Sequence, residues 1–281
     1  MEQIDIRNAV EQLIKINRVE KIALKDLQII KKIGEGGQAT VFKAIYEGQP
    51  VAVKFINTID WKNLAHEIVI TANLLHPNIP KFYGIVAEES NPGLIFEYID
   101  GKTLNNMDPL SIPYDFKIKI LKDLASVIHL LHTNRIIHRD LKPDNIIIDK
   151  VNNVYLIDYG ISKVITQRDT KTRTKGTLNY LAPECLISKG ESADSVICQI
   201  TTAVDIWAFG CLTSWLFSGI EPWSDKYKEN LVRKALEEMK PFPIPDVITD
   251  INIINIITNC TKINLEKRWN TNKLCDFLES I

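Results

Sequence analysis

Three polar residues in the middle of the chain have side chains suited to metal binding and proton transfer. Asp140 and Asn145 lie in residues 137–145, which read Ile-His-Arg-Asp-Leu-Lys-Pro-Asp-Asn, and Asp158 directly follows the mainly apolar run 154–157. Carboxylate and amide oxygens bind hard cations, and a separate carboxylate can accept a proton. The same residues could instead cap the turn of a hairpin. The length of the complete string favours the chemical interpretation.

A glycine-rich stretch nearer the N-terminus offers a second kind of chemistry. Residues 34–41 read Gly-Glu-Gly-Gly-Gln-Ala-Thr-Val. Because glycine has no Cβ, such a backbone can close over a ligand and direct its N–H groups at phosphate oxygens. A glycine-rich hairpin is more often simply a tight turn. The stretch lacks the Gly-Lys-Ser/Thr ending of a P-loop, and no helix follows it as a dinucleotide-binding turn requires.

Lys54 ends the strand-like run Val-Ala-Val-Lys at residues 51–54. A lysine that alternates with apolar neighbours points into a binding site or into solvent, and a single strand lysine is most often solvated. Glu67 lies in the helix that is expected next along the chain. Its carboxylate could hold the lysine in place.

The first third of the chain is predicted to form a small antiparallel sheet that positions the glycines and the lysine. Runs of β-branched and aromatic residues between glycine-bearing turns predict strands. These runs cover 27–33, 40–46, 50–56, about 81–86 and about 94–98. One helix is expected after the third of these strands, over 63–75, and it ends before Pro77 because the residue preceding a proline disfavours helix.

Beyond the Asp-Gly turn at residues 100–101 the chain becomes mainly helical. Apolar residues recur at helical spacing over 116–132. Further helices are expected over 203–218, 228–239, 251–261 and 271–280. A strand-rich part followed by a helix-rich part predicts an α+β fold in two lobes: a small lobe with an antiparallel sheet and one main helix, and a larger, mainly helical lobe.

Residues 2–19 predict a short amphipathic helix, because their apolar residues recur at helical spacing. Such a stripe most often packs on its own domain, and the alternative is a helix that docks a partner or a second copy. We therefore assign 1–26 to an N-terminal helix and extension, and 27–281 to one domain with lobes at about 27–98 and 99–281.

Composition and charge exclude several classes of protein. The 281 residues are 45% hydrophobic and 25% charged, which excludes disordered, collagen-like and coiled-coil chains. A net charge of −1 gives no reason to expect a nucleic-acid partner or an anionic membrane surface. The first residues are acidic and lack an apolar core, so we expect no signal peptide, and no run approaches the roughly 18 apolar residues that span a membrane. Five cysteines without a Cys-x-x-Cys pair favour free thiols in a reducing compartment, so we expect a cytoplasmic protein.

These motifs stand in the order that they have in eukaryotic protein kinases, and the chain resembles that family from about residue 27 to its C-terminus. Residues 137–145, the Asp-Tyr-Gly of 158–160 and the Ala-Pro-Glu of 182–184 carry the resemblance. It implies the two-lobed kinase fold and a eukaryotic-type catalytic domain of the serine/threonine pattern, similar to the tyrosine-kinase-like group.

The resemblance implies catalytic roles for four residues. Lys54 would contact the α- and β-phosphates of ATP, and Glu67 would hold Lys54. Asp140 would accept the proton of the substrate hydroxyl, and Lys142 is the second functional residue of that catalytic loop. Phosphoryl transfer needs positioning and charge neutralisation more than covalent chemistry, and these groups could supply both.

The family's cofactors are ATP and Mg²⁺, with Mn²⁺ as an alternative, and Asn145 and Asp158 match its metal ligands. Other residues match the positions that surround the nucleotide, with Phe96 as the gatekeeper and 97–99 as the hinge. The nucleotide-binding set is Ile33, Gly34, Gly36, Gly37, Ala39, Val41, Ala52, Lys54, Phe96, Glu97, Ile99 and Ile147. Arg268 matches the late arginine that pairs with Glu184 of Ala-Pro-Glu.

Lys142 and Thr177 match the serine/threonine-specific pattern, although dual specificity stays open. Arg139 beside Asp140 could pair with a phosphorylated threonine and order the activation loop. The candidate threonines are Thr170, Thr172 and Thr174. The alternative is that these threonines only decorate a basic loop.

The sequence departs from the family pattern without losing a catalytic group. Ala39 replaces the third loop glycine, which adds only a methyl group and is tolerated unless its φ is positive. Tyr159 replaces the usual phenylalanine, and its hydroxyl needs a partner if buried; Thr71 is a speculative one. The stretch between the Ala-Pro-Glu motif and the next helix is long, which predicts a surface insertion around 189–200.

The sequence thus predicts a Mg-ATP-dependent serine/threonine kinase that acts on protein substrates and is regulated by phosphorylation of its activation loop. Two alternatives belong to other classes. A pseudokinase would bind partners without transfer, but it would be expected to lack one of the catalytic groups. A small-molecule phosphotransferase is disfavoured by Ala-Pro-Glu and by the segment before it. The sequence leaves the oligomeric state and the physiological substrate open.

Overall fold

The structure is a computed structural model, and it divides the chain into two compact units. The first unit comprises residues 1–101 and 149–160, and the second comprises 102–148 and 161–281. The residues that the structure describes are 14–16, 19–37, 39–57, 61–86, 88, 92–159, 163–164, 171–172, 178–185, 198–199, 201–223 and 240–281. The expected helix over 228–239, most of the expected N-terminal helix, Thr170, Thr174 and most of the 189–200 insertion lie outside these residues.

The first unit is built on a six-stranded sheet with the strand order β1-β5-β6-β4-β3-β2. Its strands are β1 (Glu20–Ile22), β2 (Gln28–Glu35), β3 (Ala39–Tyr46), β4 (Gln49–Ile56), β5 (Phe82–Val86) and β6 (Gly93–Glu97). Five of them pair antiparallel, which confirms the expected sheet. β1 was not expected and pairs parallel with β5 at the edge. The 3-10 turn η1 (Leu24–Asp26) joins β1 to β2.

The alternating sequence of β4 explains how the sheet presents Lys54. Val51, Val53 and Phe55 are buried on one face, while Ala52 and Lys54 point to the other. β3 and β4 are joined by a two-residue turn in which Glu47 and Gly48 both have positive φ, 48° and 77°. This is the turn geometry that matches the twist of an antiparallel hairpin, so it fixes the register of the two strands.

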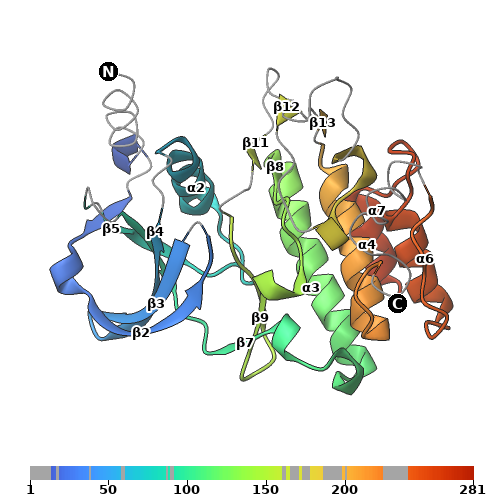
Figure 1. Cartoon of the computed structure of the whole chain (residues 1–281), viewed down its shortest axis with the longest axis horizontal. Coiled ribbons are helices and arrows are strands. Elements are labelled where there is room, and N and C mark those ends of the chain that lie inside the picture. Colours follow the sequence, from blue (N-terminus) through green and yellow to red (C-terminus); the bar gives the residue numbers. More distant parts are fainter. Residues whose placement is uncertain are drawn as a thin grey trace. The chain divides into compact units, whose positions relative to one another are not determined.

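Two apolar clusters lie on the two faces of the sheet. The helix α2 (Trp61–Asn73) runs alongside the sheet (Figure 1) and contributes Leu64, Ala65 and Ile68 to one cluster. That cluster also contains Leu94, whereas its neighbour Ile95 belongs to the cluster on the opposite face. Because successive strand residues point to opposite faces, α2 packs on the face that carries Lys54.

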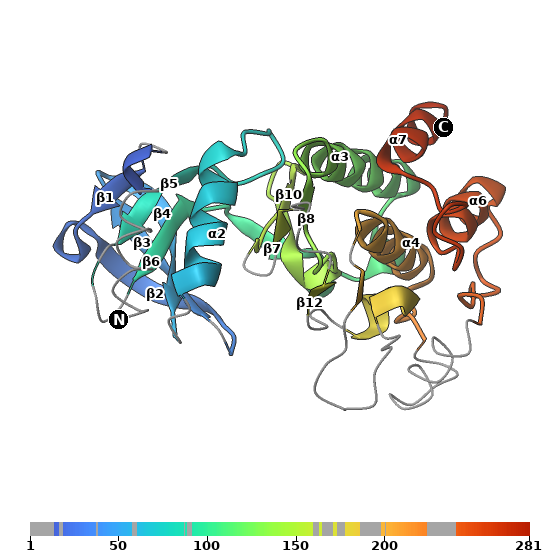
Figure 2. The same ribbon diagram turned by 90° about the horizontal axis from the view of Figure 1, so that it is seen from above.

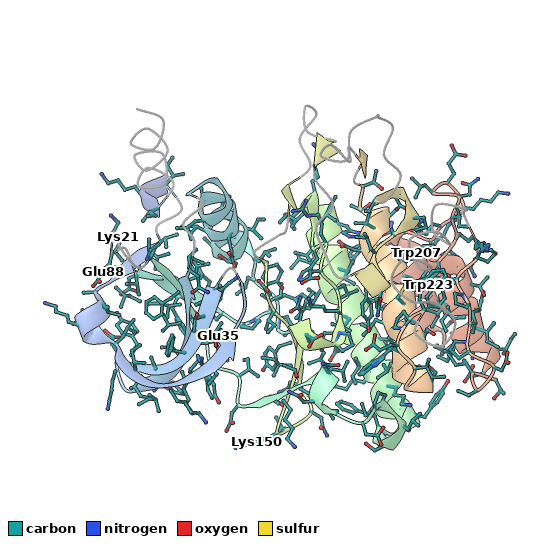
Figure 3. All side chains as sticks on the ribbon, viewed as in Figure 1. Lys21, Glu35, Glu88, Lys150, Trp207 and Trp223 are labelled. Atoms are coloured by element: carbon teal, nitrogen blue, oxygen red, sulfur yellow. The ribbon has the colours of Figure 1, made fainter. Side chains whose placement is uncertain are left out.

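The second unit is mainly helical. Figure 2 shows α3 (Tyr114–Thr133) beside α7 (Thr271–Glu279) and α4 (Ala203–Ser218) beside α6 (Ile251–Cys260). The bounds of α4 are those predicted, and the other three helices agree with their predictions to within two residues. α4 is buried along almost its whole length, as its continuous apolar sequence indicates. In Figure 3, Trp207 of α4 lies close to Trp223, and both indoles pack edge-on against Phe242.

The described residues also form several short elements. The strands are β7 (Gly101–Thr103), β8 (Ile136–Ile137), β9 (Ile146–Asp149), β10 (Val154–Leu156), β11 (Lys163–Val164), β12 (Lys171–Thr172) and β13 (Cys198–Gln199). The 3-10 turns are η2 (Leu104–Asn106), η3 (Pro109–Ser111), η4 (Pro143–Asn145), η5 (Leu178–Tyr180) and η6 (Pro183–Cys185). β8 precedes Asp140 in the sequence and β11 follows it, and these two strands pair antiparallel. None of the described helices is long and apolar enough to cross a membrane.

Candidate active site

Lys54 is the centre of an ion-pair cluster in the first unit. Its Nζ lies 2.7 Å from Oε1 of Glu67 and 2.8 Å from Oδ1 of Asp158. Lys54 comes from β4, Glu67 from α2 and Asp158 from the turn after β10. The structure therefore brings together three predicted residues that are far apart in the sequence, and it confirms that Lys54 is not simply a solvated strand lysine.

Burial and charge act in opposite directions on this cluster. Burial lowers the pKa of Lys54, but the two carboxylates outweigh burial and raise the pKa well above its usual range, so the ammonium stays protonated. Burial raises the pKa of Glu67 above its usual value of 4.5, and the attraction of Lys54 offsets this only in part. Asp158 keeps 46% of its side chain exposed. A fixed cation next to an accessible carboxylate suits the binding of phosphate oxygens and a metal ion.

A strained backbone and a short hydrogen-bond chain hold Asp158 in place. Asp158 has a φ of 66°, in the left-handed region that non-glycine residues rarely adopt. The buried Tyr159 donates from its hydroxyl to the carbonyl oxygen of Leu156 at 3.2 Å. Leu156 donates its N–H to Asn78 O at 2.9 Å, and Asn78 Nδ2 donates to Val154 O at 2.8 Å. The turn that carries Asp158 is thus fixed at both ends.

The expected hydrogen bond between Tyr159 and Thr71 is wrong. Thr71 donates instead to the carbonyl oxygen of Glu67 at 2.7 Å, one helical turn earlier in α2. A carbonyl four residues earlier lies within reach of any helical threonine, so it competes successfully with a distant hydroxyl. Tyr159 uses the carbonyl of Leu156 in the same way, close to its own position in the chain.

Several nucleotide-binding candidates share the face of the sheet that carries Lys54. Val41 is the register partner of Lys54, and Phe96 is the partner of Ala52, so these four side chains lie on one face. Val41, Ala52 and Phe96 are each half-buried. Glu97 follows Phe96 and makes two hydrogen bonds with Lys81. The N–H of Glu97 donates to the main-chain oxygen of Lys81, and the N–H of Lys81 donates to Glu97 Oε2. The expected hinge therefore starts from a fixed position.

The glycine-rich loop joins β2 to β3, as predicted. Ile33, Gly34, Gly36 and Gly37 are exposed or half-exposed, and the N–H of Gly36 donates to Ala39 O at 2.9 Å. Ala39 does not have a positive φ, so the methyl group in place of the third glycine causes no backbone strain. Of the remaining candidates, Ile99 follows the strand β6, and Ile147 lies half-buried in β9 of the second unit.

Asp140, Lys142 and Asn145 come together in a compact loop of the second unit. Asn145 Nδ2 donates to the main-chain oxygen of Asp140 at 2.7 Å and to its Oδ2 at 3.0 Å. Lys142 Nζ lies 2.9 Å from the same Oδ2. An amide donor and a cation thus orient the carboxylate of Asp140. Both hydrogen bonds of Asn145 use its nitrogen, which leaves its Oδ1 oxygen for a cation.

Asp205 anchors this loop through hydrogen bonds to its main chain. Its role in the site was not predicted from the sequence. Its carboxylate is fully buried in α4 and accepts from the N–H groups of His138 at 2.9 Å and Arg139 at 2.8 Å. Its Oδ2 also lies 2.9 Å from Nε2 of His132. Burial alone would raise the pKa of Asp205, but His132 and these other partners lower it below 3.8. Asp205 therefore stays ionised and fixes the residues directly before Asp140.

The predicted pair of Glu184 and Arg268 is present in the second unit. Arg268 Nη1 and Nη2 contact the two carboxylate oxygens of Glu184 at 2.6 and 3.0 Å, a two-pronged geometry that only arginine can make. Arg268 Nη1 also donates to Ala203 O, and its Nε donates to Lys262 O. Since Arg268 is buried, these bonds tie the Ala-Pro-Glu segment to the start of α4.

Comparison with known proteins identifies the family. The sequence pattern of the protein kinase domain matches residues 27–277. The chain belongs to the protein kinase family. It is 30% identical to an Aurora kinase of Eremothecium gossypii, over 81% of this chain and 62% of the relative.

Two further kinase relatives carry serine/threonine or mitogen-activated names. A probable serine/threonine-protein kinase, gdt2 of Dictyostelium discoideum, is 28% identical over 92% of this chain and 16% of its own length. The mitogen-activated protein kinase kinase kinase ANP1 of Arabidopsis thaliana is 28% identical over 77% of this chain and 34% of its own length. The chain spans less than two thirds of the length of each of these kinases.

The oxygens present fit the divalent cation that protein kinases use together with ATP. Asp158 offers a partly exposed carboxylate, and Asn145 offers the oxygen of an amide whose nitrogen is already bonded. Among the described residues, no three His, Cys, Asp or Glu side chains gather as a ready-made metal cage. Mg²⁺ is typically held by one or two protein oxygens together with substrate phosphates, so the oxygen that each unit offers is of a type that suits Mg²⁺.

Proposed function

We propose that this chain is a protein kinase that transfers the γ-phosphoryl group of Mg-ATP to serine or threonine hydroxyls of protein substrates. The observation that supports this most directly is the ion-pair cluster of Lys54, Glu67 and Asp158, in which a largely buried lysine is held between two carboxylates. The oriented Asp140 in the second unit supplies the other half of the chemistry. A chain that had become a pseudokinase would not be expected to keep both sets engaged.

In this reaction the first unit supplies charge. Lys54 remains protonated because of its two carboxylate partners, so it can bind the α- and β-phosphate oxygens without a proton transfer. Asp158 and Asn145 would hold Mg²⁺, or Mn²⁺ in its place. The bound ion would neutralise phosphate charge as a Lewis acid. The glycine-rich loop between β2 and β3 supplies main-chain N–H groups for phosphate oxygens.

The loop around Asp140 supplies the base and the choice of acceptor. Asp140 accepts the proton of the attacking hydroxyl, and the bonds from Asn145 and Lys142 keep its carboxylate in one orientation. Lys142 carries a positive charge next to that carboxylate. The charge suits the transferred phosphoryl group, and lysine at this position belongs to the serine/threonine pattern. Dual specificity is an outcome that the experiment below would detect.

We also propose that phosphorylation of the activation loop regulates transfer. The candidates remain Thr170, Thr172 and Thr174, and the structure describes only the main chain of Thr172, in β12. A phosphate in this loop would add negative charge that a basic side chain can bind. Four cysteines among the described residues form no disulfide, which supports the further proposal of a reducing, cytoplasmic location.

The test is transfer of radiolabelled γ-phosphate from Mg-ATP to the protein itself and to a generic protein substrate. Wild-type protein should incorporate label on serine and threonine, and Asp158→Ala should not. Asp123→Ala is the matched control, because it removes an aspartate whose partner is the exposed Lys119 on α3. ATP binding without transfer in the wild type would support the pseudokinase alternative, and label on tyrosine would show dual specificity.

A further inference from the structure

The N-terminal segment before the kinase match is part of the first unit. Residues 14–16 are helical, and the N–H of Val19 bonds to Ile14 O at 2.9 Å. This bond connects the helical residues to Val19, directly before β1. Ile14 is only 3% exposed, whereas Ile16 in the same helical turn is 74% exposed. One side of this turn is therefore fixed in the protein core.

β1 anchors the segment to the sheet. It runs parallel to β5, with Glu20 opposite Gly84 and Ile22 opposite Val86, and Figure 2 shows the two strands side by side. A Cβ on Gly84 would lie 2.4 Å from the main-chain oxygen of Glu20, so the close approach requires glycine. Tyr46 donates its hydroxyl to Glu20 Oε1 at 2.8 Å, and this bond raises the pKa of Tyr46 to about 12.

The segment contributes to both faces of the sheet. Ile22 lies in the cluster with Val53 and Ile95, on the face away from α2. Ile14 lies in the other cluster, with Leu64, Ala65 and Ile68 of α2 and with Leu94 of β6. Both isoleucines are almost equally buried, at 3% and 4% exposure. The two isoleucines differ in the face of the sheet on which they pack.

The face of α2 that Ile14 helps to cover is continuous with Glu67. Ile68 follows Glu67 directly, and Leu64 lies one helical turn before Glu67 and Ile68. The packing of α2 thus sets the distance from Glu67 to Lys54, which is 2.7 Å. Glu67 gains its low-dielectric surroundings from the same packing, since burial is the main influence on its pKa. A change under α2 is expected to reach the ion pair through these side chains.

We propose that Ile14 is a positioning residue and that residues 14–16 and 19–22 together fix α2, so that Glu67 stays on Lys54. β1 holds the segment on the sheet, and Ile14 fills the apolar space beside α2. The segment thereby stabilises the nucleotide-binding arrangement from outside the part that matches the kinase family, residues 27–277. This inference deepens the proposed function, because the ion pair matters only if Lys54 binds phosphate.

The test uses the full chain with Ile14→Ala and the more disruptive Ile14→Asp. The readout is the rate at which an amine-reactive ester modifies Lys54 without nucleotide, measured by mass spectrometry. When Glu67 moves away, Lys54 loses one of the two carboxylates that cover its ammonium group. The amine then becomes more accessible to the reagent, so modification should accelerate. We expect acceleration by at least about fivefold, the lower end of typical coupling between sites. The KM for ATP should rise in parallel. The conservative variant Ile14→Val should keep most of the wild-type behaviour.

Two matched controls separate positioning from general stability. Ile22→Ala removes an equally buried isoleucine from the opposite face, so it should lower the melting temperature without changing Lys54 reactivity. Ile16→Asp adds a charge at an exposed position of the same helical turn and should change neither. The Ile14→Ala protein is measured below its melting temperature, so a folding failure of Ile14→Asp does not end the test.

Two results would overturn the inference: Ile14→Ala leaves Lys54 reactivity at the wild-type rate, or Ile22→Ala accelerates it equally. Neither result depends on phosphoryl transfer. If the wild-type protein binds nucleotide but transfers no phosphate, the proposed function fails while Lys54 reactivity still decides whether Ile14 positions α2. If Ile14→Ala changes neither readout in an active kinase, only the inference fails.

Discussion

The two units hold their candidate site residues in different ways. In the first unit, charge holds together Lys54, Glu67 and Asp158. In the second unit, main-chain hydrogen bonds fix the loop that contains Asp140 and Asn145. In the first unit, the three charged groups come from a strand, a helix and a turn, and two ion pairs centred on Lys54 join their side chains. In the second unit, two consecutive N–H groups bond to the buried Asp205 before the chain reaches Asp140.

The two sets therefore differ in how much they depend on packing elsewhere in the protein. A side-chain cluster keeps its geometry only while α2, β4 and the Asp158 turn stay in register, so small shifts of α2 reach Lys54. A loop tied by its backbone to a buried carboxylate is preorganised and changes little until that carboxylate is lost. We therefore expect the nucleotide-binding set to be adjustable and the catalytic loop to be rigid.

Asp205→Asn should give the largest effect, because it breaks the rigid set at its anchor. The amide nitrogen of asparagine would face N–H donors, and His132 would lose its charged partner. Losing one partner of a buried charged network costs about 3–5 kcal/mol, so the free energy of unfolding should fall by that amount. Urea unfolding of the purified variant measures it. An unchanged unfolding midpoint would show that the loop is held by other contacts.

Lys54→Met should remove transfer, and it should cost less stability than Asp205→Asn because burial raises the pKa of Glu67, which favours its neutral form. The variant removes the cation that faces phosphate and leaves Glu67 buried without its partner. Removing one preorganised electrostatic group commonly costs about 10²–10³ in rate, so we expect kcat to fall by that factor. Lys119→Met, on the exposed surface of α3, is the matched control and should keep wild-type activity. A Lys54→Met enzyme with more than a tenth of wild-type kcat would contradict the assignment.

The pH dependence should distinguish the two sets. Because burial raises the pKa of Glu67, its carboxylate takes up a proton at a pH above 4.5, and nucleotide affinity should fall as the pH decreases through that raised pKa. The stability contribution has the opposite sign: protonated Glu67 favours the folded state, fully so below pH 4.5, and this contribution is lost as the pH rises through the folded pKa.

Glu67→Gln is the check on this pH effect, since it cannot titrate. Nucleotide titrations at several pH values should show an acid limb, that is, a loss of affinity at low pH, in the wild type and none in the variant. Asp205, whose pKa is lowered, stays ionised throughout that range, so the catalytic loop should not contribute to the limb. An acid limb that persists in Glu67→Gln would assign it to another group.

Tyr159→Phe should have the smallest effect of the four. It removes one buried hydrogen bond to Leu156 O and leaves the aromatic ring in place. A single such bond contributes about 1 kcal/mol, so a loss of about fivefold in kcat/KM and a small drop in melting temperature are expected. An increase in kcat would instead show that the hydroxyl restrains Asp158 in a less active arrangement.

The sequence predicted the elements whose side chains repeat with a clear period. The alternation in residues 51–55 correctly placed Lys54 on the opposite face from Val53, and the apolar run over 203–218 predicted α4 to the residue. Asp205 was missed as a site residue, although it is the single charged residue in that run. A lone carboxylate in a buried helix needs partners, and that is the signal that could have found it.

Tertiary contacts decided the features that the sequence could not predict. β1 has three residues and no alternating pattern, and it forms because Gly84 lets Glu20 approach and Ile22 completes a core. The predicted partner of the Tyr159 hydroxyl, Thr71, was wrong because nearby main-chain carbonyls compete with any distant side chain. The positive φ of Asp158 likewise has no signature in the residue type alone.

The most direct test of this account measures nucleotide affinity and phosphoryl transfer side by side in Asp140→Asn. The substitution keeps the size of the side chain and removes the base, while the Lys54 cluster is untouched. The account predicts wild-type affinity for Mg-ATP and a transfer rate lower by about 10²–10⁴, the usual contribution of a positioned base. Transfer at the wild-type rate in a folded Asp140→Asn protein would contradict the account.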